Sequence, residues 1–159
     1  MPLAHQTTYA ATKAAVLSMS RSLNEELRLT GEDDAIRVAT IMPWAVDTPW
    51  WIHAANYTGR APRMAAMDEP AMVIDAIVRA CVEPEEEIPV GAKARVSNAS
   101  HQWFPELTER LSAELADREI AKADPLPHTS GAIHAPMKEG AGINGGIRDR
   151  MAREDAQRH

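Results

Sequence analysis

The chain has 159 residues, a formal net charge of −6 at pH 7 and 45% hydrophobic residues, values typical of a globular protein of about one domain. This acidic balance argues against nonspecific nucleic-acid binding, which needs clustered Lys and Arg to neutralise phosphates. No apolar stretch approaches the roughly 20 residues that cross a bilayer, so we expect a cytoplasmic protein without membrane contacts.

The first predicted element is a helix from Thr8 to about Leu29. Its apolar residues recur at helical spacing and form one stripe, which consists of Val16, Met19, Leu23 and Leu27. Such a stripe usually packs against the protein's own core.

Tyr9 and Lys13 stand at positions i and i+4 of this helix, so their side chains project from one face, one turn apart. A nearby ammonium favours the phenolate and lowers the pKa of a tyrosine from its usual value of about 10. Tyr9 could then exchange a proton with an alcohol or carbonyl oxygen near neutral pH. The alternative is that Tyr9 is an aromatic residue at the helix start and Lys13 a solvated lysine.

A short apolar run from Ile36 to Met42, broken only by Arg37, suits a parallel strand that is covered on both faces. Pro43 ends the run. The loop from Trp44 to Trp50 then lies beyond the carboxyl end of the strand, where open parallel sheets bind their ligands.

The remaining elements follow in a regular order up to residue 123. An irregular lid covers 50–67, and Asp68-Glu69-Pro70 opens a helix that continues to about Cys81. Ile88-Pro89-Val90 predicts a short strand at a sheet edge, because proline donates no ladder hydrogen bond. After a polar link, Phe104 to about Lys122 predicts a further helix.

Residues 124–159 are rich in proline, glycine and charge, and we expect them to be extended or disordered. Gly140 to Gly145 fits the pattern G-x-G-x-x-G. No buried strand precedes it, and too few residues follow it for the rest of a βαβ unit. It is therefore interpreted as a flexible loop and not as a phosphate-binding turn.

Three motifs together resemble the short-chain dehydrogenase/reductase family: Tyr9-x-x-x-Lys13, Ile36-Arg37-Val38 and Pro43-x-x-Val46-x-Thr48. The resemblance implies an α/β fold. Residues 1–123 would form the C-terminal half of a Rossmann-like, doubly wound parallel sheet, and 124–159 a Pro/Gly-rich tail. The N-terminal βαβ cofactor half, with the family's glycine-rich turn and catalytic serine, is absent before Tyr9. Trp44 also stands where the family usually has glycine.

The resemblance assigns a role to each site residue. Tyr9 would be the catalytic acid and base, and Lys13 would tune it and bind the nicotinamide ribose. Pro43, Val46 and Thr48 would close over the nicotinamide carboxamide. The cofactor is NAD or NADP, and the residues that choose between them lie in the missing half.

Three tryptophans lie near this loop, namely Trp44, Trp50 and Trp51. They either wall a pocket for an apolar alcohol or ketone or fill space between the lid and the body. No two histidines have the spacing that places two ligands on one helical face, so we expect no metal.

Two functions remain open at this point. The first is an NAD(P)-dependent alcohol dehydrogenase or ketone reductase, present as a truncated chain that is inactive in isolation. The second is a catalytically inert half-protein that serves as an oligomerisation or binding module. The resemblance also implies a homo-oligomer that pairs through the first helix.

Overall fold

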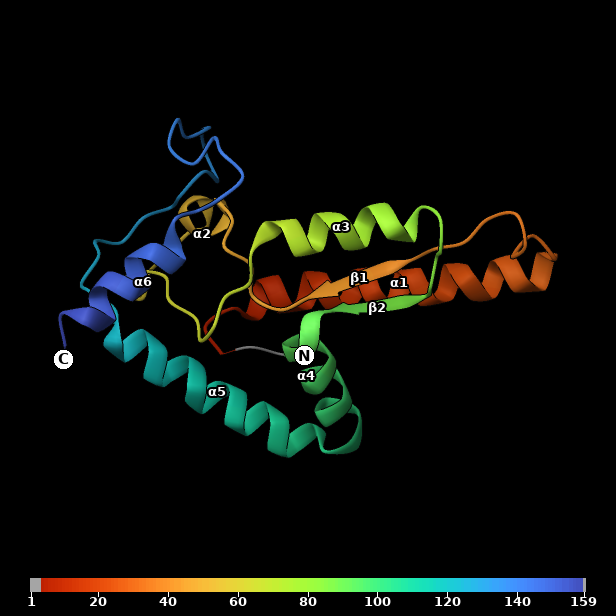
Figure 1. Cartoon of the computed structure of the whole chain (residues 1–159), viewed down its shortest axis with the longest axis horizontal. Coiled ribbons are helices and arrows are strands. Elements are labelled where there is room, and N and C mark those ends of the chain that lie inside the picture. The colour runs from red at the N-terminus through yellow and green to blue at the C-terminus, as the bar shows by residue number, and fades with distance from the viewer. Residues whose placement is uncertain (1–3, 159) are drawn as a thin grey trace. The chain divides into compact units, whose positions relative to one another are not determined.

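The computed structural model describes residues 4–158, and over this range it has a two-stranded parallel sheet and six helices (Figure 1). The predicted α/β class is thereby confirmed. In chain order, the elements are α1 (Thr7–Thr30), β1 (Thr40–Pro43), α2 (Trp50–His53), α3 (Pro70–Ala80), β2 (Glu87–Val90), α4 (Gly91–Trp103), α5 (Pro105–Lys122) and α6 (Ile147–Ala156).

The chain divides into two compact units. The first contains the residues up to Trp44 together with Ala71–Arg110, and the second contains Ala45–Pro70 together with the residues from Leu111 onward. The first unit therefore holds the sheet, and the second holds the predicted lid and the C-terminal tail.

Helix α1 has the extent that its sequence predicts. It ends at Gly31, whose φ of 73° is left-handed, a conformation that glycine adopts without steric cost. The Gly31 N–H donates to the Arg28 carbonyl at 3.2 Å, and the Glu32 N–H donates to the Leu27 carbonyl at 2.9 Å. These two bonds close the last turn as in a Schellman motif.

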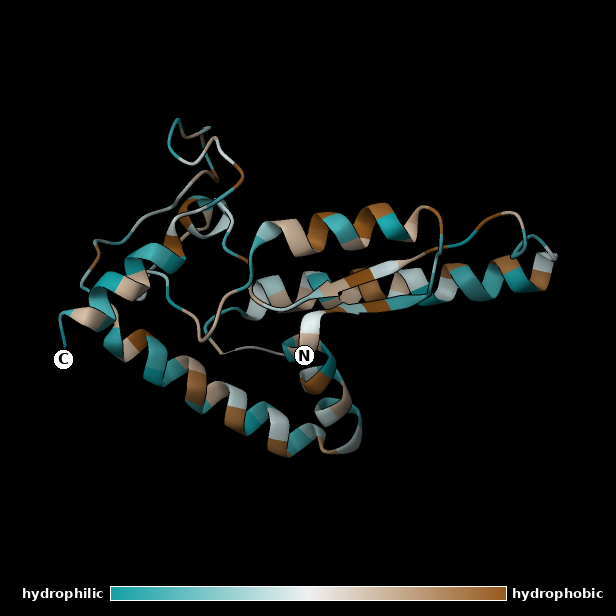
Figure 2. Ribbon diagram, in the orientation of Figure 1, coloured by the Kyte–Doolittle hydropathy of each residue, from teal (hydrophilic) through white to brown (hydrophobic). Residues whose placement is uncertain are grey.

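The sheet pairs β1 with β2 in parallel, in a register that runs from Thr40 opposite Glu87 to Pro43 opposite Val90. Helices α1 and α3 run alongside the strands, and apolar residues follow β1 and α3 (Figures 1 and 2). The predicted strand at Ile88–Val90 is confirmed.

Strand β1 is shorter than predicted, because residues 36–39 make no ladder. The side chain of Asn24, only 8% exposed, bonds both backbone groups of Val38 instead. Its Nδ2 donates to the Val38 carbonyl at 2.9 Å, and its Oδ1 accepts from the Val38 N–H at 3.1 Å. The strand prediction is wrong for this stretch, since a helix side chain takes the place of a partner strand.

Helix α4 occupies the segment that was predicted to be a polar link. Ala94 is its buried residue, so the helix lacks the broad apolar stripe by which sequence patterns reveal helices. Gly91 opens α4 at a φ of 79° directly after β2, which lets the strand and the helix join without a loop.

The second unit has a core of small or flexible side chains. The buried apolar residues are Ala61, Met64, Met67, Ala116, Ala123 and Ile147. Two isolated bridges join the lid segment to the tail, at Asn56–Thr129 and at Arg60–Pro125.

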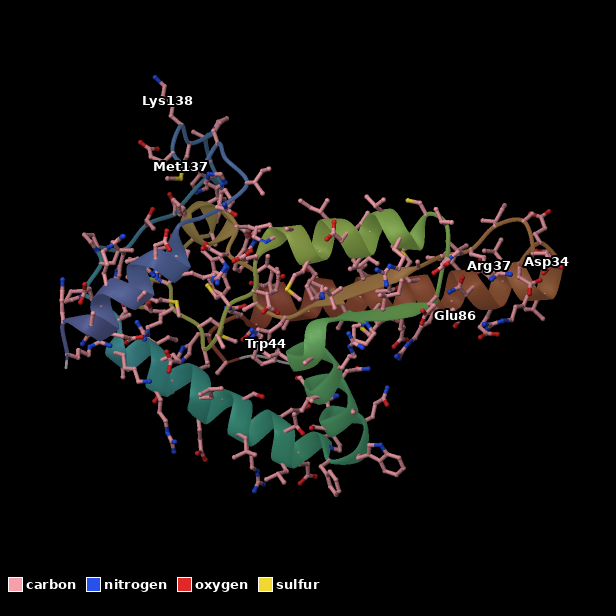
Figure 3. All side chains as sticks on the ribbon, in the orientation of Figure 1. Asp34, Arg37, Trp44, Glu86, Met137 and Lys138 are labelled. Atoms are coloured by element: carbon pink, nitrogen blue, oxygen red, sulfur yellow. The ribbon has the colours of Figure 1, made fainter. Side chains whose placement is uncertain are left out.

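The prediction of an extended or disordered tail is wrong for residues 147–156, which form α6. Most of α6 is charged and offers no apolar stripe, so the sequence pattern gave no signal of it. Residues 140–145 form turns and bends, with no preceding strand, and the prediction of a loop there is confirmed. Lys138 lies in the loop that precedes α6, and its side chain projects outward (Figure 3).

Candidate functional site

Tyr9 and Lys13 lie together in the first turns of α1. The Lys13 Nζ is 5.5 Å from the centroid of the Tyr9 ring, within the range of a cation–π contact. The Tyr9 side chain is 40% exposed, and Lys13 is exposed. A phenol and an ammonium thus share one face of the helix, and both are accessible to solvent.

Burial raises the pKa of Tyr9 above its usual value. The expected lowering by Lys13 is therefore wrong for this structure. The ammonium lies over the ring, and partial removal of water favours the neutral phenol. Tyr9 consequently keeps its proton at neutral pH and is available as a proton donor.

Pro43 and Trp44 follow at the carboxyl end of β1, in the same unit as Tyr9. Pro43 is exposed and Trp44 is half-buried. Trp44 is labelled at this end of the strand in Figure 3.

Val46 and Thr48 belong to the second unit, in a tight loop. The Thr48 N–H donates to the Val46 carbonyl at 2.9 Å, and the Trp51 indole donates to the same oxygen at 2.8 Å. Val46 also forms an isolated parallel bridge with Asp68. The Val46 carbonyl therefore acts as the anchor of this loop.

The two neighbouring tryptophans form an edge-to-face pair, in which the ring centroids of Trp50 and Trp51 are 5.0 Å apart at an interplanar angle of 83°. Trp50 is 37% exposed. The indole N–H of Trp51 is used within the loop, and the edge-to-face pair stabilises this loop.

Sequence reasoning missed Asp47, which is 6% exposed. Its Oδ1 accepts from the Ile147 N–H at 2.9 Å and its Oδ2 from the Arg148 N–H at 3.2 Å. The carboxylate therefore caps the start of α6. No local pattern could reveal this, since the partners are about a hundred residues apart.

It also missed Arg63, whose side chain is 3% exposed. The guanidinium donates at 2.9 Å to Glu119 and at 2.9 Å to Glu154, and it holds both carboxylate oxygens of Asp155 at 2.5 and 2.7 Å. Burial alone would lower the pKa of Arg63, but these hydrogen bonds outweigh it and the pKa is raised. The sequence offered one sign of this role, since Arg63 is the single charged residue within the apolar segment Ala61–Met67.

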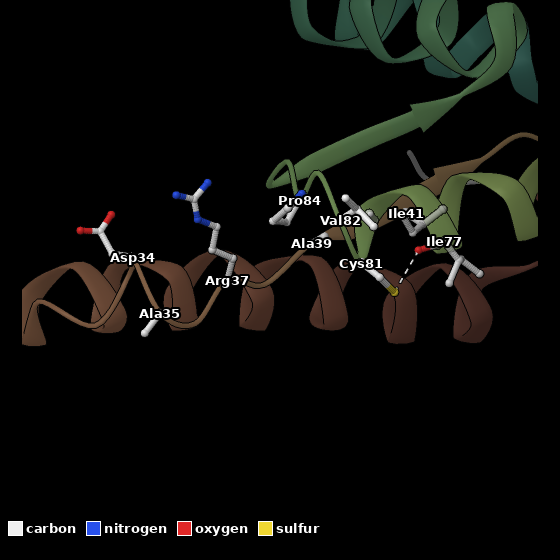
Figure 4. A pocket seen from close by; sticks show the side chains of 10 residues that line it. Asp34, Ala35, Arg37, Ala39, Ile41, Ile77, Cys81, Val82 and Pro84 are labelled. Atoms are coloured by element: carbon white, nitrogen blue, oxygen red, sulfur yellow. Dashed lines mark hydrogen bonds between the residues drawn. The ribbon is translucent and has the colours of Figure 1, made fainter.

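A groove of about 760 Å³ lies in the first unit, and none of its lining residues is a predicted site residue (Figure 4). It is lined by the loop after α1, by β1 and by the end of α3: Asp34, Ala35, Arg37, Ala39, Ile41, Ile77, Ala80, Cys81, Val82 and Pro84. Cys81 is exposed, and its thiol donates to the Ile77 carbonyl at 3.4 Å.

Among residues 4–158, no three His, Cys, Asp or Glu side chains gather in a way that could hold a metal ion. Over the same range, no helix is both long enough and apolar enough to cross a membrane.

Residues 1–56 match the family model described as short chain dehydrogenase. The uncharacterised oxidoreductase YxnA of Bacillus subtilis (strain 168) is 30% identical over 112 residues, which cover 69% of this chain and 31% of that protein. The chain therefore spans about a third of that relative's length. No solved structure gives a significant match. The family model and the oxidoreductase relative together support the short-chain dehydrogenase family for this chain.

Proposed function

We propose that this chain carries the catalytic pair of an NAD(P)-dependent oxidoreductase that interconverts alcohols and ketones. The observation that carries the proposal is the pair itself. Tyr9 and Lys13 share one face of α1, with Lys13 Nζ 5.5 Å from the ring centroid, inside the segment that matches the short chain dehydrogenase model.

Tyr9 is assigned the proton transfer. A nicotinamide carries a hydride, so the protein must supply or remove the accompanying proton. A phenol that keeps its proton at neutral pH can donate it to the oxygen of a carbonyl substrate as that oxygen gains negative charge. In ketone reduction Tyr9 is thus the proton donor, and in alcohol oxidation the phenolate accepts the proton back.

Lys13 and the loop of Thr48 are assigned to the cofactor. The exposed Lys13 ammonium can donate hydrogen bonds to ribose hydroxyls, and as a fixed cation it stabilises a phenolate that forms transiently at Tyr9. In the second unit, the Thr48 hydroxyl can exchange a hydrogen bond with a carboxamide, whereas the Thr48 N–H and the Val46 carbonyl are already used within the loop. Each of these groups is chemically suited to one part of a nicotinamide nucleotide, Lys13 to the ribose and Thr48 to the carboxamide.

The parallel β1–β2 pair with its helices is consistent with part of a Rossmann-like sheet. In the proposal, the glycine-rich turn of the family holds the phosphates and belongs to a segment outside this chain. The 159 residues alone should then show negligible turnover and no low-micromolar affinity for NADPH.

The test is a chimera in which the nucleotide-binding half of a short-chain dehydrogenase precedes this chain. It is assayed with NADH and NADPH against a panel of apolar ketones. We expect activity in the chimera and a loss of about 100-fold or more with Tyr9→Phe, the scale of a lost general acid.

Tyr57→Phe is the matched control, because Tyr57 is the second tyrosine of the chain and is 66% exposed. It removes the same hydroxyl from a position outside the proposed site and should leave the rate unchanged. Equal activity of the Tyr9→Phe chimera and its parent would refute the proposed role of Tyr9.

A further inference from the structure

We propose that residues 139–148 act as an internal strap that positions the loop from Val46 to His53, with Asp47 as the positioning residue that joins the two. The importance of the loop for catalysis rests on the proposed function. The strap itself rests on contacts within the second unit alone.

The first contact is the Asp47 carboxylate at the start of α6. The first N–H groups of a helix have no partner within the helix, and Gly146 at the N-cap has no side chain to satisfy them. The two carboxylate oxygens of Asp47 accept hydrogen bonds instead, from the Ile147 N–H at 2.9 Å and from the Arg148 N–H at 3.2 Å. A buried carboxylate and the positive end of the helix thus stabilise each other.

The second contact is a close approach of two backbones. The Gly145 N–H donates to the Asp47 carbonyl at 3.2 Å. A Cβ at Gly145 would lie 2.4 Å from the Thr48 carbonyl oxygen and 2.7 Å from its carbon, far inside van der Waals contact. Only glycine at 145 lets the tail lie directly on the residue assigned to the cofactor.

The third contact fixes the end of the loop. The His53 Nε2 donates to the Glu139 carbonyl at 2.7 Å, and the Ala132 N–H donates to the His53 carbonyl at 2.8 Å. Tail segments thus hold His53 through its ring and through its backbone.

The far end of α6 is also held by the lid segment. Arg63 binds Glu154 and Asp155 with side-chain distances from 2.5 to 2.9 Å, and both Arg63 and Glu154 have side chains that are 3% exposed. Separating buried charges leaves each without compensation. The tail is therefore a lasting support of the loop and not a lid that opens in each turnover.

The test uses the full 159-residue chain without cofactor or substrate. The readout is hydrogen exchange of the Trp51 indole N–H by NMR, because this proton lies in the loop's own hydrogen bond to Val46. The signal is assigned with Trp51→Phe. In Gly145→Ala, the added methyl group pushes the strap off Thr48, and we expect the indole proton to exchange at least about tenfold faster, as loosened local structure does.

Gly142→Ala is the matched control, since a Cβ at Gly142 meets nothing within 4 Å. It should leave the exchange rate unchanged. Asp47→Ala should speed exchange like Gly145→Ala, whereas Asp47→Asn keeps one capping oxygen and should restore most of the protection.

Equal indole exchange in wild type, Gly145→Ala and Asp47→Ala would overturn the strap. So would the same acceleration in Gly142→Ala. If Gly145→Ala fails to fold, the strap is tested by comparing the indole exchange rate of Asp47→Ala with that of Asp47→Asn. An inactive chimera contradicts only the proposed function, because the exchange measurement needs no catalysis.

Discussion

Tyr9 illustrates how a single residue is tuned by what surrounds it. Its pKa is raised by burial, although a cation lies over its ring. A charge at the ring face does less for the phenolate than one beside the oxygen, where the negative charge resides. In this chain Tyr9 is consequently protonated at neutral pH, in the form that can donate a proton.

The raised pKa of Tyr9 can be measured directly. In a Tyr57→Phe variant Tyr9 is the single tyrosine, and its ionisation can be followed by the ultraviolet absorbance of tyrosinate. We expect the midpoint to lie above about 10, the ordinary value, and to return to that value in urea. A folded-state midpoint at or below the urea value would contradict the prediction.

The same shift has a consequence for stability. Because the folded state holds the Tyr9 proton more tightly than the unfolded state, its contribution is complete below about pH 10 and is lost as the pH rises through the folded-state pKa. Tyr9→Phe should therefore flatten the alkaline fall in stability.

At the scale of elements, Asn24 joins α1 to the segment before β1. Its amide matches the Val38 N–H and C=O at the same time, as a neighbouring strand would. Without the Asn24 amide, the N–H and C=O of Val38 would be removed from water and left without a hydrogen-bond partner, which costs free energy.

Asn24→Ala should therefore lower the free energy of unfolding by about 1 to 3 kcal/mol. Urea unfolding followed by circular dichroism measures this as a lower midpoint at an unchanged slope. Glu26→Ala, an exposed change on the same helix, is the control and should shift stability by less than about 0.5 kcal/mol. Equal effects of the two variants would show that Asn24 contributes only helix propensity.

The sequence predicted the elements that have a local signal. Helix α1 has its apolar stripe, α3 opens with Pro70, and β2 is a β-branched run around Pro89. The start of β1 was misjudged, because Asn24 acts across fourteen residues of sequence.

Helices α4 and α6 were missed for a related reason. Each buries few apolar residues, so periodicity does not reveal it. The start of α6 is fixed by Asp47, and its end by Arg63. Pairings this distant in sequence are decided by tertiary structure, which no local pattern encodes.

The same contrast between local and long-range signals applies to the candidate site. The spacing of Tyr9 and Lys13 along a helix predicted that their side chains would meet. It could not predict the pKa of Tyr9, which depends on how much water the surroundings remove. The close approach of the tail to Thr48 was equally hidden, since the G-x-G-x-x-G pattern that contains Gly145 gives no sign of the distant backbone it lies against.

At the scale of the whole molecule, the described residues have no large side chain that is fully buried, and many large apolar side chains are exposed. The α1 stripe is part of this surface, with Val16 47%, Met19 66% and Leu23 43% exposed. Exposed apolar surface of this kind is typical of chains that bury it against a further polypeptide.

We therefore expect the chain to self-associate through this stripe. Light scattering after size exclusion should give a mass above the 17.4 kDa of one chain. Met19→Lys should shift the population toward the monomer, because it places a charge in the stripe that self-association would bury. Leu29→Lys is the control, since Leu29 is 88% exposed and lies off the stripe. A mass of one chain at every concentration would refute the prediction.

The exposed thiol of Cys81, which lines the groove, offers a practical means of following unfolding and self-association. Cys81 is the single cysteine of the sequence, so a maleimide dye attaches once per chain and reports on the first unit alone. Labelling of the native protein should be complete without denaturant, since the thiol is exposed. The same accessibility lets two chains join by a disulfide in air, so any mass measured without reductant would count covalent pairs as if they were assembled ones.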